Sequence, residues 1–110
     1  MNKAIAIQFV EYFCEGNIDQ LALLLSSEFY FHGPLCQFNN ANAYIEALRQ
    51  DPPENSECLI KSITENESQV AIFYDYLKHG EALPIAQLFE FDAQHKIKQI
   101  QLVFDARYMD

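Results

Sequence analysis

Four β-rich segments follow one another from Glu57 onward, and only short polar gaps separate them. The gaps are Asn66–Glu67, His79–Gly80 and Ala93–Gln94. Gaps this short connect neighbouring strands as hairpins, so the strands are predicted to run antiparallel. The segments span residues 57–65, 69–78, 83–92 and 96–105. An antiparallel sheet of this length needs a cover over one face, and the preceding residues must supply it.

Residues 3–15 are predicted to form the first helix of that cover, which Gly16 ends. Their apolar residues follow the i, i+4, i+7, i+8 spacing that places side chains on one helical face. These residues are Ile5, Phe9, Tyr12 and Phe13.

A second helix is predicted to begin after Asn17, a favoured N-cap residue, with Asp19 and Gln20 in its first turn. A short strand over 29–32 follows, because apolar residues there alternate with a period of two up to Gly33–Pro34. The apolar residues assigned to the second helix are Ile18, Leu21, Leu24 and Leu25.

A third helix is predicted over residues 41–50, with Tyr44, Ile45 and Leu48 on one side. It ends before Pro52 because proline lacks the amide that a helix needs. The predicted order of elements is therefore ααβαββββ, an α+β class in which an antiparallel sheet packs on N-terminal helices.

The composition is that of one compact domain over residues 1–110, with half of the residues hydrophobic. Sixteen Asp and Glu against seven Lys and Arg give a net charge of −9, and no basic cluster occurs, so no nucleic-acid partner is expected. The longest purely apolar stretch, residues 21–25, is far below the roughly 20 residues of a membrane helix. No membrane association and no secretion signal are expected.

Three cysteines stand at wide spacing, Cys14, Cys36 and Cys58. An odd number at this spacing is typical of neither a disulfide framework nor a CxxC zinc or redox site. They are therefore predicted to be reduced thiols in a cytoplasmic protein.

The order of these elements, together with four short sequence segments, resembles that of the nuclear transport factor 2-like superfamily, in its SnoaL-like, ketosteroid-isomerase-like branch. The resemblance covers nearly the whole chain, and it implies a cone-shaped curved sheet wrapped around N-terminal helices, with an apolar cavity open at one end. The segments are Phe9–Val10–Glu11–Tyr12–Phe13, Gly16–Asn17–Ile18–Asp19–Gln20–Leu21, Phe31–His32–Gly33–Pro34 and Phe89–Glu90–Phe91–Asp92.

The catalytic residues of ketosteroid isomerases are absent from the corresponding positions. Those enzymes use an Asp base and an oxyanion hole made by a Tyr and a protonated Asp. Phe9 stands where the resemblance places the tyrosine, Gly33–Pro34 replaces the Asp–Pro of the base, and Gln87 replaces the buried Asp. Because a glutamine amide neither gains nor loses a proton near neutral pH, it cannot serve as a proton shuttle, and steroid isomerisation by that route is not expected.

Eight residues are predicted to line the ligand pocket, either from strand parity or from the resemblance. Gln87 is the exception among its apolar strand neighbours, so its amide is expected either to hold a ligand or to pair with a neighbouring tyrosine or backbone carbonyl. Tyr74 and Tyr76 lie on the same strand face as Ile72, so their hydroxyls are expected to point into the same pocket as Gln87. The alternative is that these tyrosines only pack against their neighbours. The eight are Phe9, Phe13, Tyr74, Tyr76, Gln87, Phe89, Leu102 and Phe104.

His32 is the one candidate general base, since its ordinary pKa of about 6.5 suits neutral pH, although its parity is opposite to that of Phe29 and Phe31. Asp75 and Asp105 are expected to be solvated or paired charges. No HxxxH, HxH or carboxylate cluster accompanies a histidine, so neither a metal nor a cofactor is expected.

These observations predict a SnoaL-like protein that binds a small, largely apolar molecule, with proton-transfer chemistry of isomerase, cyclase or dehydratase type as an open question. The alternative is a non-catalytic homodimeric interaction or scaffold protein whose pocket is filled by its own side chains. A homodimer is expected in both cases, because the opposite sheet face is also apolar. That face carries Ala71, Phe73, Leu77, Ala86, Leu88 and Val103.

Overall fold

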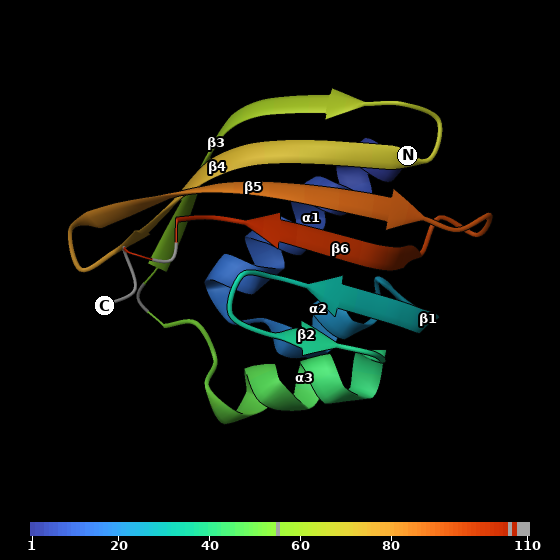
Figure 1. The fold of residues 1–110 in the computed structure, drawn as a ribbon, viewed down its shortest axis with the longest axis horizontal. Coiled ribbons are helices and arrows are strands. Elements are labelled where there is room, and N and C mark those ends of the chain that lie inside the picture. The colour runs from blue at the N-terminus through green and yellow to red at the C-terminus, as the bar shows by residue number, and fades with distance from the viewer. Residues whose placement is uncertain (55, 106, 108–110) are drawn as a thin grey trace.

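The computed structural model describes residues 1–54, 56–105 and 107, and it confirms the α+β class (Figure 1). Most of the predicted elements are found within a few residues of their predicted bounds, and one short strand is additional. The elements are α1 (Asn2–Glu15), α2 (Ile18–Ala22), β1 (Leu25–His32), β2 (Gln37–Phe38), α3 (Ala41–Gln50), β3 (Ser56–Glu65), β4 (Gln69–Lys78), β5 (Glu81–Phe91) and β6 (Ile97–Val103).

The strands form one six-stranded sheet in the order β2-β1-β6-β5-β4-β3. As predicted, β3 to β6 are consecutive antiparallel neighbours. The strand β1 is the exception to antiparallel pairing. It lies beside β6 and runs parallel to it, with Leu25 opposite Ile97. Register shifts interrupt the β3–β4, β5–β6 and β1–β6 pairs, and such irregularities bend a sheet and increase its twist.

Helix α1 lies behind the curved sheet, while α3 lies beyond its β1–β2 end (Figure 1). Gly16 ends α1 with a left-handed φ of 73°, and its N–H donates to the Phe13 carbonyl. A Cβ at this position would also lie 2.9 Å from the Pro53 carbonyl oxygen, so only glycine fits. The side chains of Asn17 and Asn40 cap α2 and α3, as expected of asparagine.

The predicted boundary between the second helix and the first strand was wrong. Helix α2 ends at Ala22, and β1 already begins at Leu25, four residues before the predicted start. Leu25 and Ser26 are both buried and lie in the sheet, so the Leu25 side chain belongs to a strand and not to the apolar face of a helix. The two-residue strand β2 was not predicted, because a segment this short shows no periodicity.

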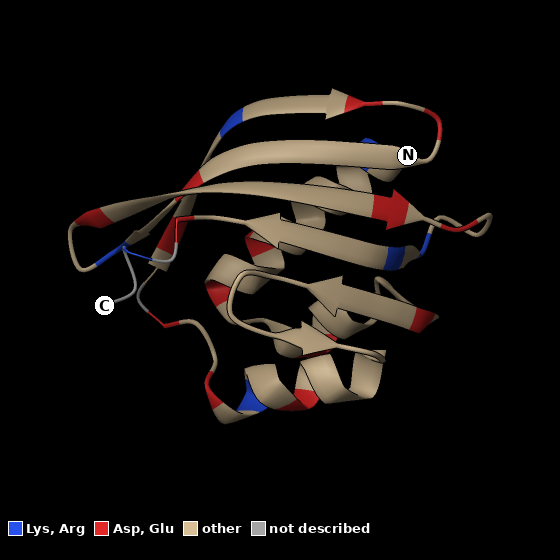
Figure 2. Ribbon diagram, in the orientation of Figure 1, with Lys and Arg blue, Asp and Glu red and all other residues tan. Residues whose placement is uncertain are grey.

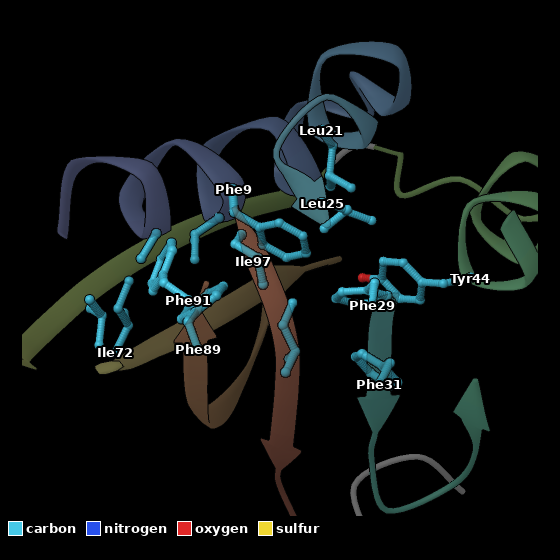
Figure 3. Packing of buried hydrophobic residues seen from close by; sticks show 14 of the residues in the cluster. Phe9, Leu21, Leu25, Phe29, Phe31, Tyr44, Ile72, Phe89, Phe91 and Ile97 are labelled. Atoms are coloured by element: carbon cyan, nitrogen blue, oxygen red, sulfur yellow. The ribbon is translucent and has the colours of Figure 1, made fainter. Parts of the chain in front are cut away.

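The hydrophobic core lies between the concave sheet face and the helices. Figure 3 shows Phe9 of α1, Leu21 of α2 and Tyr44 of α3 directed toward Phe29, Phe89 and Ile97 of the sheet. We call this space the interior. Its fully buried large side chains are Phe9, Phe29, Phe89, Leu21, Ile72, Ile97, Ile100, Val10 and Val70.

The prediction of three reduced thiols was wrong. Cys14, at the end of α1, forms a disulfide with Cys58 of β3, with the two Cα atoms 6.1 Å apart, whereas Cys36 is free and exposed. The two half-cystines are 44 residues apart, so only the packing of α1 against β3 brings them together. Sequence spacing alone contains no sign of that contact.

The cytoplasmic location was inferred from reduced cysteines, and that inference loses its basis. Disulfides persist mainly in oxidising compartments, and a stable Cys14–Cys58 bridge is unusual for the cytosol of a mesophile. None of the helices formed by the described residues combines the length and the apolar character needed to cross a bilayer.

Candidate ligand site in the sheet interior

All eight predicted lining residues lie on the side of the fold that contains the core. Phe9, Tyr74, Gln87 and Phe89 are buried there. The other four, Phe13, Tyr76, Leu102 and Phe104, are partly buried and pack against the same cluster. Strand parity correctly placed Tyr74, Gln87 and Phe89 on the concave face. The part of all eight side chains in ligand binding stays a prediction.

Aromatic side chains fill part of the interior. The Phe9 and Phe89 rings meet edge to face, with centroids 5.4 Å apart, and the Phe13 and Tyr76 rings are tilted, with centroids 6.1 Å apart. Such pairs contribute beyond their buried area, by about 0.5–1.5 kcal/mol each.

Gln87 and Tyr74 form a buried polar pair in this apolar region. The Tyr74 hydroxyl donates to Gln87 Oε1 at 2.7 Å, so the pairing with a neighbouring tyrosine that the sequence left open is present. Burial raises the pKa of the Tyr74 hydroxyl well above its ordinary value, with a further contribution from Tyr76, so Tyr74 stays a donor. The amide nitrogen of Gln87 has no hydrogen-bond partner within the described part of the chain.

Tyr44 is a polar residue of the interior that the sequence did not single out. It was assigned to the apolar side of the third helix, and it is indeed only 4% exposed. Its ring packs against Phe29, Phe31 and Phe38 with centroid distances of 5.2, 4.8 and 5.7 Å. Periodicity predicts burial of a tyrosine but not the surroundings of its hydroxyl.

His32 lies at the end of β1 and is exposed, whereas the neighbouring Phe31 is buried. Its side chain is therefore directed away from the interior, where the predicted ligand would lie. The role of His32 as a general base stays a prediction. Among residues 1–54, 56–105 and 107, no group of three His, Cys, Asp or Glu side chains is placed to hold a metal ion.

The two carboxylates considered for acid–base chemistry are both paired, as expected. Asp75 forms an ion pair with Lys61 at 2.8 Å on the outer face. Asp105 binds Arg107, and the hydrogen bonds from that guanidinium and its backbone N–H lower the pKa of the exposed Asp105 carboxyl. Neither carboxylate reaches the interior.

The convex outer face of the sheet is apolar and hollowed. Leu59, Phe73 and Val103 are each 55% exposed there. Two adjoining hollows, of about 260 and 180 Å³, share Phe73, Ala86 and Val103 in their walls. Figure 2 shows charged residues mainly toward the ends of the strands, with none in the middle of β5 or β6.

The substitution Gln87→Leu is expected to lower the free energy of unfolding by about 1–3 kcal/mol, because it leaves the Tyr74 hydroxyl buried without a partner. The double variant Gln87→Leu/Tyr74→Phe removes both members of the pair and should recover most of this loss. Urea unfolding of the two single variants and the double variant measures the coupling. Wild-type stability of Gln87→Leu would show that the two side chains do not depend on each other.

The fold is that of the nuclear transport factor 2-like proteins, as solved structures show. An NTF2-like protein of unknown function from Cytophaga hutchinsonii superposes with a TM-score of 0.85 at 16% identity, covering 99% of this chain and 94% of that one. A candidate ketosteroid isomerase from Kribbella flavida gives 0.83 at 12% identity, covering 94% and 77%. An LEH-like epoxide hydrolase from M. tuberculosis gives 0.80 at 13% identity, covering 96% and 84%.

These likenesses concern the fold alone. No protein-family model matches the chain, and no curated protein matches it either. The names of the similar structures include an isomerase and a hydrolase, so one curved sheet supports different reactions. The function of this chain therefore depends on the side chains of its interior and of its outer face.

Proposed function

We propose that the protein binds a small, largely apolar and uncharged molecule in the interior of the sheet. The observation that carries this proposal is the buried Tyr74–Gln87 pair, in which the Gln87 amide nitrogen is not used by any described residue. Since no sealed side-chain nitrogen or oxygen of the described residues lacks a partner, the Gln87 amide nitrogen still reaches solvent, and a guest that brings an acceptor can bind it. Most of the other side chains of the interior are apolar, so the guest is expected to be largely apolar.

Binding fits the interior better than proton transfer does. Tyrosines apart, Ser26 and Gln87 are the polar residues among the buried side chains described, and neither accepts a proton near neutral pH. The resemblance places Phe9, Gly33 and Gln87 where the isomerases have their catalytic groups, and His32 is exposed. We therefore propose a binding protein without ketosteroid isomerase activity.

Native mass spectrometry of the purified protein tests this proposal. The expected result is a bound small molecule that is retained under gentle conditions and is lost on unfolding. Its extraction and identification would give the chemical class. A protein that carries no guest and also fails to bind small aromatic ketones and hydrocarbons would contradict the proposal and favour the alternative of an interior filled by Phe9 and Phe89.

A second role, homodimerisation through the outer face, is supported by the exposed apolar side chains on that face. The chain is acidic overall, yet the centre of the face carries no charge, so two copies can meet there without facing like charges. The ion pair of Lys61 with Asp75 borders one hollow and supplies both signs of charge. Large exposed apolar patches on soluble proteins commonly mark such interfaces.

Sedimentation at micromolar concentration is expected to give about twice the 12.7 kDa of one chain. Leu88→Asp places a charge on the face and should shift the mass toward that of one chain. Leu35→Asp is the matched control, since Leu35 is exposed in the turn between β1 and β2 and should leave the dimer intact. A wild-type protein that sediments as one chain would exclude this interface.

A further inference from the structure

The burial of the interior decreases toward one end of the sheet. On β4 the inward side chains of Val70 and Ile72 are fully buried, whereas Tyr76, further along the same face, is only partly buried. The same change occurs along β5 and β6, which approach this end at the start of β5 and at the end of β6. We call this end the mouth of the interior. Its partly buried side chains are Phe13, Tyr76, Leu83, Leu102 and Phe104.

The Cys14–Cys58 disulfide lies at the mouth. Cys58 is the register partner of Tyr76 across β3 and β4. Phe13 directly precedes Cys14 in α1, and its ring contacts the Tyr76 ring with the centroids 6.1 Å apart. The bridge therefore fastens α1 to the sheet at the point where the last turn of the helix covers the mouth.

The noncovalent contacts around the bridge are weak by comparison. The Ser56 hydroxyl donates to the Cys14 carbonyl oxygen at 3.2 Å, and the Phe13–Tyr76 ring pair is only partly buried. The strand β3 is an edge strand of the sheet, where it pairs with β4 and packs against α1. Segments with few buried contacts open locally at a small cost in free energy. The bridge is therefore the strongest link between two segments that can separate without global unfolding.

A reductant can reach this bridge, because both half-cystines are partly exposed. A dithiol supplies the electrons and protons that the reaction needs. Its first thiolate attacks one Sγ and breaks the Cys14–Cys58 S–S bond, and its second thiolate then releases the mixed disulfide. The products are the two cysteine thiols and the oxidised, disulfide form of the reductant, and an oxidised dithiol reverses the reaction.

We infer that the Cys14–Cys58 bridge is a redox switch at the mouth. It holds the mouth narrow in the oxidised protein, and its reduction lets the last turn of α1 move away from β3 while the remainder of the fold persists. The switch rests on the proposed binding function for its purpose, since the mouth is the end at which a guest would enter toward Tyr74 and Gln87. The opening itself requires no guest.

Hydrogen–deuterium exchange of wild-type protein, with and without dithiothreitol, tests the opening. Reduction should speed exchange by about tenfold or more in peptides from the end of α1 and the start of β3, and much less in β5 and β6. Reoxidation should restore slow exchange. Cys14→Ala/Cys58→Ala should behave like reduced wild-type protein in both buffers. Cys36→Ala should respond to dithiothreitol like wild-type protein, because it removes only the free exposed thiol.

Ile100→Ala is the control for a general loss of stability. Ile100 is a fully buried residue of β6, so its truncation destabilises the fold away from the mouth. The oxidised variant should therefore show no selective acceleration at the end of α1 and the start of β3. If reduction of wild-type protein accelerates exchange equally in all peptides, or in none, the redox switch is overturned.

Acetophenone serves as the probe for a guest. If it binds, reduction should speed its dissociation by about tenfold or more, as NMR exchange between free and bound probe would show, because a wider mouth eases release. Selective opening at the mouth without acetophenone binding would support the switch and contradict the proposed binding function. Acetophenone binding with the same dissociation rate in both redox forms, together with uniform exchange, would support the binding function and overturn the switch.

Discussion

Loss of the Cys14–Cys58 disulfide is expected to lower the free energy of unfolding by about 4 kcal/mol. The estimate follows from the chain entropy that the bridge removes from the unfolded state, given that the two half-cystines are separated by 44 positions in the sequence. The bridge also fixes the end of α1 to β3, where the Ser56 hydroxyl donates to the Cys14 carbonyl oxygen at 3.2 Å. A loss of this size is a large share of the stability of a small domain.

Urea unfolding with and without dithiothreitol measures this effect. The variant Cys14→Ala/Cys58→Ala should unfold at the same urea concentration in both buffers, close to reduced wild-type protein. Cys36→Ala, which removes only the free exposed thiol, should behave like wild-type protein in both. Equal stability of oxidised wild-type protein and the double variant would show that the bridge does not form in solution.

Phe9→Ala is expected to destabilise the protein by about 3–5 kcal/mol, the usual cost of deleting a buried phenylalanine ring. Phe9 is 1% exposed and meets Phe89 edge to face, so its removal should leave a cavity in the centre of the interior. Cavities lined by apolar side chains stay dry and accept small hydrocarbons. Benzene should therefore raise the melting temperature of Phe9→Ala.

Phe9→Leu keeps part of the side-chain volume and is the matched control for this prediction. It should lose less stability than Phe9→Ala, and benzene should raise its melting temperature less. Thermal unfolding with and without benzene gives both quantities. A loss below about 1 kcal/mol for Phe9→Ala would mean that the Phe9 ring is not packed as the contact with Phe89 implies.

Local sequence signals predicted much of the fold. The hairpin gaps at Asn66–Glu67 and His79–Gly80 located β3, β4 and β5, because a short polar turn between two apolar runs permits little else. Alternation within each strand then assigned Tyr74 and Gln87 to the buried face. In contrast, the parallel pairing of β1 with β6 and the bridge between Cys14 and Cys58 join distant segments, and no local signal indicates them.

The candidate site was predictable only as a face, not as a set of bonds. Strand parity predicted that both Gln87 and Tyr74 are buried. Only the structure shows that Gln87 Oε1 accepts the hydrogen bond from Tyr74, while its amide nitrogen is not used. Tyr44 was not singled out because hydrophobic periodicity treats tyrosine as an apolar residue. Its contacts with Phe29 and Phe31 are visible only in the folded structure. Polar atoms inside an apolar core are settled by tertiary packing.

The parallel pairing of β1 with β6 has a consequence for synthesis on the ribosome. Leu25 finds its sheet partner Ile97 only after nearly the whole chain has emerged. Until then β3, β4 and β5 can pair with one another, while β1 can pair only with the two-residue strand β2. Contacts this distant in sequence slow folding and leave apolar surface exposed for longer. We therefore expect β1 to join β6 later during synthesis than β3, β4 and β5 join one another.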